Sequence, residues 1–148
     1  MAKAVQAVRS RGLELARVLL VGGDLTSRLT LQTVLEAGGY RVDAAASAAE
    51  AVGKLEECQY ELVLSDLQME SPEAGLKVLA HARMMDYKPA TALITTYRDA
   101  KRRSASKKAV GTVLIEPEDL PELLSKVAEL VSERATRRVE RELRHAGF

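Results

Sequence analysis

From residue 17 onward, short β-type runs alternate with longer stretches of helical pattern, and this alternation restricts the fold more than any other feature. It indicates a parallel sheet with helices on both faces. Most of the runs are nearly continuous in apolar residues, as expected of strands that are covered on both sides. The predicted strands are Arg17–Val21, Arg41–Ala45, Leu62–Ser65, Ala92–Thr95 and Thr112–Ile115. The chain is therefore expected to be an α/β domain with a doubly wound, five-stranded parallel sheet.

The first two predicted helices carry recognisable end signals. Gly38 and Gly39 would end the first helix by adopting left-handed backbone conformations, which other residues avoid. Ser47 with Glu50 forms a capping-box pattern that opens the second. Cys58, the single cysteine, is interpreted as an apolar residue of that second helix. One cysteine excludes an internal disulfide and suits a reducing compartment.

Three further helices are predicted. The third covers about residues 75–85, and the fourth, about residues 98–110, has only a thin apolar face. The last starts near Asp119 and tolerates Pro121 in its first turn. Its apolar positions toward the sheet are predicted to be Leu120, Leu124, Val127 and Val131.

The length of 148 residues leaves room for one folded domain. We expect an N-terminal arm or short helix over residues 1–15, a domain over 16–131 and a charged helical extension over 132–148. In the extension, Ala135, Val139 and Leu143 continue a thin apolar stripe at intervals of four.

The totals exclude several classes of function. The 22 basic and 21 acidic residues nearly cancel, so no global field marks the chain as a nucleic-acid or membrane binder. No run approaches the ~20 apolar residues that span a bilayer, and no apolar h-region precedes Arg9 and Arg11, so we expect no secretory signal. We expect a cytoplasmic protein. His81 and His145 lack a nucleophile or acid at motif spacing, so we expect no enzymatic turnover.

In doubly wound sheets, ligands bind at the carboxyl ends of the strands. The residues that follow the predicted strands there are Gly22-Gly23-Asp24, Asp66, Thr95-Thr96 and Glu116-Pro117. With the stretch Ser-Asp66-Leu-Gln-Met and the segment Pro-Glu-Asp-Leu-Pro-Glu-Leu-Leu before the last helix, the region from Ala16 to Val131 resembles bacterial response-regulator receiver domains. The resemblance implies a flavodoxin-like sheet with strand order 2-1-3-4-5.

The resemblance also implies that Asp66 stands where the family has an aspartate that accepts a phosphoryl group from a histidine kinase. In the family, two acidic residues after the first strand hold Mg²⁺, and a lysine after the fifth pairs with the phosphoryl oxygens. The acidic pair aligns with Gly22 and Gly23, and the lysine aligns with Glu116. Because phosphoryl transfer depends on charge neutralisation, ordinary phosphotransfer should be slow or absent.

The other switch positions are mixed. Thr95 matches the hydroxyl residue that contacts the phosphoryl group, whereas Val113 stands where the family often has an aromatic residue. Asp24 could serve as a substitute metal ligand with Asp66 and the backbone carbonyl of Gln68, since oxygen ligands suit Mg²⁺. No cofactor is expected apart from this candidate Mg²⁺.

The fourth predicted helix carries a basic face, whose interpretation as an ordinary solvated surface remains open beside that of a binding site for an acidic partner. Its residues are Arg98, Lys101, Arg102, Arg103, Lys107 and Lys108. Nucleic-acid binding through this face and the tail is a less favoured alternative, because no DNA-binding module follows.

The leading hypothesis from the sequence is an atypical receiver, or pseudo-receiver, that acts as an interaction or dimerisation module. Its expected partners are a signalling protein or a histidine kinase, and a second copy of the chain is plausible because the last helix is long. A working phosphoacceptor that uses Asp66 and Asp24 is the main alternative.

Overall fold

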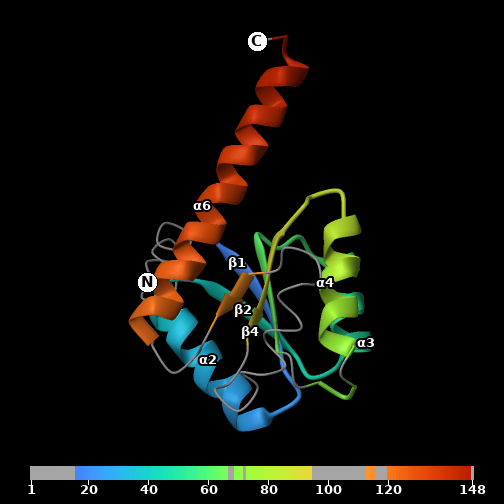
Figure 1. Cartoon of the computed structure of the whole chain (residues 1–148), viewed down its shortest axis with the longest axis vertical. Coiled ribbons are helices and arrows are strands. Elements are labelled where there is room, and N and C mark those ends of the chain that lie inside the picture. The colour runs from blue at the N-terminus through green and yellow to red at the C-terminus, as the bar shows by residue number, and fades with distance from the viewer. Residues whose placement is uncertain (1–15, 67–68, 72, 95–112, 116–119, 148) are drawn as a thin grey trace, which may run out of the picture.

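The computed structural model describes residues 16–66, 69–71, 73–94, 113–115 and 120–147. Its elements follow one another as β1 (Arg17–Val21), α2 (Leu25–Ala37), β2 (Arg41–Ala45), α3 (Ala48–Glu57), β3 (Leu62–Asp66), α4 (Ala74–Met84), β4 (Ala90–Ile94), β5 (Val113–Ile115) and α6 (Leu120–His145) (Figure 1). The strands form one parallel sheet in the order β2-β1-β3-β4-β5. The predicted parallel α/β architecture is confirmed, and the strand order is the one that the resemblance implied.

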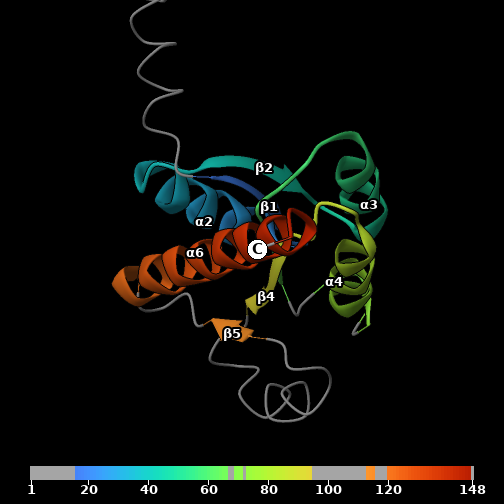
Figure 2. The same ribbon diagram turned by 90° about the horizontal axis from the view of Figure 1, so that it is seen from above.

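Helices α2 and α6 cover one face of the sheet, and α3 and α4 cover the other (Figure 2). Each strand sends alternate side chains to the two faces, so one continuous apolar run supplies two cores. In β1, for example, Val18 and Leu20 pack toward α2 and α6, whereas Leu19 and Val21 pack toward α3 and α4. All four side chains are buried.

The end of α2 differs in one detail from the expectation. Only Gly39 is left-handed, with φ of 101°, whereas Gly38 keeps a right-handed φ of −78°. Tyr40 donates its N–H to the Leu35 carbonyl at 3.1 Å, and Gly39 donates to Glu36 at 3.0 Å. These two bonds form a Schellman motif, which requires one left-handed residue rather than two.

The start of α3 is as expected and its end is not. The Ser47 side chain accepts a hydrogen bond from the Glu50 N–H at 3.2 Å, which confirms the predicted cap. Cys58, however, is the C-cap with extended backbone angles, so the expectation that it lies within the helix is wrong. The chain must extend there to enter β3.

Helix α6 corrects the predicted contacts of the last helix. Leu124, Val127 and Val131 pack against the core as expected, but Leu123 and Leu130 are buried as well. The packed face follows Leu123, Val127 and Leu130 in steps of four and three, whereas Leu124 and Val131, one position later, are only partly buried. The stripe predicted for the extension is built on steps of four, each of which turns the chain about 40° beyond a full circle, so it drifts off this face. Val139 and Leu143 are accordingly exposed. The side chain of Leu120 lies outside the described residues.

Some predicted segments cannot be compared. Residues 1–15, the fourth predicted helix and Thr95 lie outside the described residues. In the part of the chain that is described, no helix combines the length and the hydropathy that crossing a membrane requires.

Arg134 attaches α6 to the loop between α4 and β4. Its side chain is buried, its Nε donates to the Lys88 carbonyl at 3.0 Å, and its Nη2 donates to the Tyr87 carbonyl at 2.7 Å. Lys88 has a left-handed backbone with φ of 45°, which is uncommon for a residue other than glycine. The guanidinium therefore satisfies two carbonyls of a sharply turned loop.

A second polar cluster joins β1, β2 and the start of β3. One carboxylate oxygen of Asp43 accepts hydrogen bonds from the Tyr60 hydroxyl at 2.8 Å and from Arg17 Nη2 at 2.9 Å. Partial burial acts to raise the pKa of Asp43, but the hydrogen bonds from Tyr60 and Arg17 and the charge of Arg17 outweigh it and lower the pKa. The Arg17 guanidinium also lies over the Tyr60 ring, 5.3 Å from its centre.

Asp43→Asn should change how stability depends on pH. A carboxylate with a lowered folded-state pKa stabilises the fold above its unfolded pKa of about 3.9, and this contribution disappears as pH falls through the folded pKa. The free energy of unfolding of the variant should therefore lie below that of the wild type near neutral pH, with the difference shrinking in acid. Urea unfolding across pH measures this, and a difference that is constant with pH would contradict it.

Arg134→Met should destabilise the domain by ~2–4 kcal/mol. The variant lacks the guanidinium, so the carbonyls of Tyr87 and Lys88 lose the hydrogen bonds that it donates. Arg138→Met is the matched control, since Arg138 is exposed and its one ion pair with a described residue is with Glu142, one turn along α6. Its loss should cost about 0.5 kcal/mol or less. Chemical unfolding of both variants decides the point, and equal destabilisation would exclude a special role for Arg134.

Candidate functional site

The candidate site lies at the carboxyl edge of the sheet, around Asp66. Asp66 is the last residue of β3 and is paired with Ile94 of β4, while the preceding Ser65 is paired with Val21 at the end of β1. Gly22 follows Val21 and continues the ladder through its N–H, which donates to the Ala45 carbonyl of β2 at 3.0 Å. The ends of β1 and β3 are thus held in neighbouring positions.

Gly22 directly borders the Asp66 side chain. A Cβ placed on Gly22 would lie 3.8 Å from Asp66 Cβ and 3.8 Å from Asp66 Oδ2, which is ordinary van der Waals contact. The sequence placed Gly22 and Gly23 at the positions of the family's acidic pair, and the structure does bring Gly22 to the candidate acceptor. No carboxylate extends from either position. Gly23 is exposed.

Arg28 brings a positive charge to the same place. It lies in the first turn of α2, and its Nη1 donates to the Gly22 carbonyl at 2.6 Å. The Cβ that Gly22 lacks would also lie 3.8 Å from Arg28 Cβ, so Arg28 and Asp66 border the same glycine. Sequence reasoning missed Arg28. The available signal was a basic residue in the first turn of the helix that follows the first strand.

Asp24 has a structural role that the sequence did not predict. Its side chain is exposed and caps α2, with one carboxylate oxygen accepting the Ser27 N–H at 2.9 Å. Hydrogen bonding from Ser27 lowers its pKa. A cap of this kind satisfies one of the free N–H groups of the first helical turn. The suggestion that Asp24 also holds a metal ion stays a prediction.

Helix α4 packs closely on the end of β3 through Gly75. A Cβ at Gly75 would lie 2.5 Å from the Asp66 carbonyl oxygen and 3.1 Å from Ser65 Oγ. Real Cβ atoms do not approach a backbone oxygen so closely, so only glycine lets α4 lie against the acceptor strand. Ser65 itself is fully buried, with its hydroxyl 3.4 Å from the Asp66 carbonyl oxygen.

Several predicted site residues lie outside the described part of the chain. They are Gln68, Thr95, Glu116 and the basic face Arg98, Lys101, Arg102, Arg103, Lys107 and Lys108. Val113 is described only through its backbone, which begins β5 and pairs with Ala92.

The described residues do not fit the magnesium site that the family implies. Of the three carboxylates that would surround the ion, Asp66 alone is present, and the positions of the other two are glycines. Arg28 adds a guanidinium at Gly22, which disfavours a divalent cation there. Among the described residues, no group of three or more histidine, cysteine, aspartate or glutamate side chains could hold a metal ion.

Comparison with known proteins identifies the family. A search of curated proteins found no match. Among solved structures, a response regulator receiver protein from Sinorhizobium medicae is 25% identical with a TM-score of 0.70, over 82% of this chain and 98% of that chain. A CheY-like receiver domain protein from Methanospirillum hungatei is 27% identical with a TM-score of 0.71, over 84% and 99% of the two chains.

NtrX from Brucella abortus has a TM-score of 0.76 at 18% identity, over 87% of this chain and 29% of that chain, and supports the fold alone. The family model of the response regulator receiver domain matches residues 18–128. Together with the position of Asp66 at the end of β3, this match shows that the chain belongs to the response-regulator receiver domain family.

Proposed function

We propose that this receiver domain signals by binding a protein partner, and that Mg²⁺-dependent phosphorylation of Asp66 is slow or absent. The observation that carries the proposal is the set of residues beside Asp66, where Gly22 stands in place of an acidic residue and Arg28 donates to its carbonyl. The receiver scaffold is kept around Asp66, while the cation-binding residues that the family places beside it are replaced.

The physical argument concerns charge. A carboxylate that attacks an anionic phosphoryl donor needs cations to neutralise the negative charge that gathers around the transferred group. Receiver domains obtain much of this from a divalent ion held by several carboxylates. With glycine at positions 22 and 23, Asp66 would have to hold the ion largely alone, and Arg28 would repel it.

The residue after β5 supports the same proposal from the sequence. Glu116 precedes Pro117 at the position where the family has a lysine. A phosphoryl group on Asp66 would add about two negative charges, which the family's lysine attracts and which a glutamate would repel. Replacement of a cation by an anion at this position opposes phosphorylation, whereas replacement by a neutral residue would only fail to assist it.

Incubation with acetyl phosphate and Mg²⁺, followed by intact-mass measurement, tests the proposal. The wild type should show no stoichiometric phosphoryl addition. Stoichiometric, Mg²⁺-dependent addition that disappears in Asp66→Asn would overturn the proposal and favour the alternative in which Asp24 replaces the missing ligands. Asp24→Ser separates these cases further, because serine preserves the helix cap but cannot supply a carboxylate.

A restored variant provides the matched positive control. Gly22→Asp, Gly23→Asp and Glu116→Lys together return the charges of the family pattern, and a side chain at Gly22 has room for its Cβ. This variant should gain the phosphoryl mass under conditions in which the wild type does not, and should lose it again with Asp66→Asn. If wild type and restored variant are labelled equally, charge at these positions does not limit the reaction.

We also propose a homodimer formed through the apolar stripe of the α6 extension. Val139 and Leu143 have 53% and 47% of their surface exposed, although both are large apolar side chains. Val139→Ser with Leu143→Ser should reduce the mass measured by light scattering at high protein concentration, because the stripe would no longer be buried between copies. An identical mass for wild type and variant at every concentration would exclude this contact.

A further inference from the structure

The face of α6 that packs on the domain changes chemistry partway along the helix. The packed residues Leu123, Val127 and Leu130 are spaced by four and three, and the same alternation continues through Arg134, Arg137, Arg141 and Arg144. Alternating steps of four and three keep side chains on one face of a helix. A seam of apolar residues is thus continued by four arginines.

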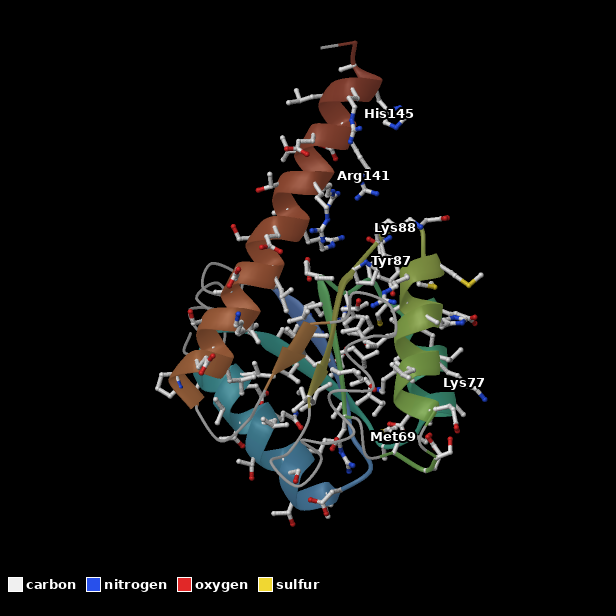
Figure 3. All side chains as sticks on the ribbon, viewed as in Figure 1. Met69, Lys77, Tyr87, Lys88, Arg141 and His145 are labelled. Atoms are coloured by element: carbon white, nitrogen blue, oxygen red, sulfur yellow. The ribbon has the colours of Figure 1, made fainter. Side chains whose placement is uncertain are left out.

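The change coincides with the end of the domain body. Arg134 is the last buried member of the seam, and beyond it α6 projects away from the sheet beside the α4–β4 loop (Figure 1). Arg141 and His145 extend from this projecting part on the side of Tyr87 and Lys88 (Figure 3). The arginine seam therefore faces the space that the domain body leaves empty.

That space is a groove with an apolar floor and mainly cationic walls. It has a volume of about 760 Å³, its floor includes Pro89, Ala90 and Leu130, and it is lined by Arg137, Arg141 and Arg144. Pro89, Ala90 and Leu130 are buried. Arg83 and Lys88 add two positive charges to the lining from outside α6. Glu133 and Glu140 of α6 also line the groove and contribute two negative charges. We call this space the arginine groove.

The two carboxylates of the groove offset only part of its positive charge, because five basic residues line it. Within the residues that the structure describes, Arg137, Arg141 and Arg144 form no ion pair. Burial lowers the pKa of Arg134, and the charges of Arg138, Arg141 and Arg137 lower it further, although Glu61 opposes them. Like charges held this close repel one another, so an anionic ligand would relieve the repulsion.

We propose that the arginine groove binds an acidic segment of a partner protein, with carboxylates on the arginine seam and small apolar side chains on the groove floor. Guanidinium groups form bidentate hydrogen bonds with carboxylates, which suits arginine more than lysine to this role. Glu133 and Glu140 disfavour a polynucleotide, whose closely spaced phosphates would meet them. The carboxylates of a peptide can be spaced to avoid both.

This inference gives the proposed interaction function a site and a class of partner, so it rests on that function. It does not depend on the chemistry of Asp66, which lies at the carboxyl edge of the sheet, whereas the groove lies at the amino end of β4. The peptide titration and the acetyl phosphate reaction can therefore succeed or fail separately.

A fluorescein-labelled peptide that repeats Glu-Ala-Ala-Glu-Ala-Ala-Ala provides the probe, because its glutamates follow the same alternate spacing as the arginine seam. Fluorescence anisotropy should show that the full chain binds it more weakly as salt is raised. Arg137→Gln with Arg141→Gln should weaken binding by about tenfold or more, in keeping with the loss of two charge-assisted contacts. Arg137→Lys with Arg141→Lys should retain part of the affinity.

Lys54→Gln with Lys77→Gln is the matched control, since it removes the same charge from α3 and α4, outside the groove. It should leave peptide affinity within about twofold. Equal weakening by both double variants, or no binding of the peptide by wild type, would overturn the proposal. So would a DNA duplex that binds more tightly than the peptide and loses affinity in the groove variant. Circular dichroism checks that each variant is folded.

Discussion

Burial of the central strands on both faces is the constraint on which the rest of the structure depends. Strands such as Leu62–Asp66 carry apolar side chains in both directions, so helices must cover each face, and the connections that cross the sheet keep the strands parallel. Parallel strands bring their carboxyl ends to one edge. Asp66 and Gly22 meet there because of this arrangement, whatever the chemistry of the residues themselves.

The same geometry separates what the fold requires at Asp66 from the charges of its neighbours. The fold needs Gly75 against the Asp66 carbonyl and Ser65 buried beneath it, and both are backbone or packing requirements. The charges around Asp66 belong to residues that packing does not determine. Position 22 has room for the Cβ of an acidic residue but carries glycine, so the charge beside Asp66 is free to vary separately from the fold.

The order of the described elements could be predicted from the sequence because strands and helices carry local periodic signals. The bounds of β4 were wrong, since it spans Ala90–Ile94 rather than Ala92–Thr95. β1 and β2 have the predicted bounds, and Ser47 caps α3 as predicted. The partner of a side chain leaves a weaker signal. A basic residue in the first turn of α2 could be noticed in the sequence, but residue type alone does not show that Arg28 donates to the Gly22 carbonyl at the end of β1.

Arg134 illustrates the same limit. Its sequence context is a highly charged helix end, which suggests a solvated residue, yet it is buried against two carbonyls 46 and 47 positions earlier in the chain. Its position on the seam with Leu123 and Leu130 was available from the alternate spacing of four and three. The stripe predicted for the extension, Ala135, Val139 and Leu143, is spaced by four throughout and does not include it. The sequence thus revealed the family of the domain more readily than the features that set this chain apart within it.

Nuclear magnetic resonance with Mn²⁺ tests most directly the proposal that no divalent cation binds beside Asp66. Mn²⁺ prefers the same oxygen ligands as Mg²⁺ and broadens the signals of nearby nuclei. The backbone amides of Gly22 and Asp66 should broaden no more than exposed amides elsewhere. Selective broadening of these amides that Mg²⁺ reverses and Asp66→Asn abolishes would contradict the proposal.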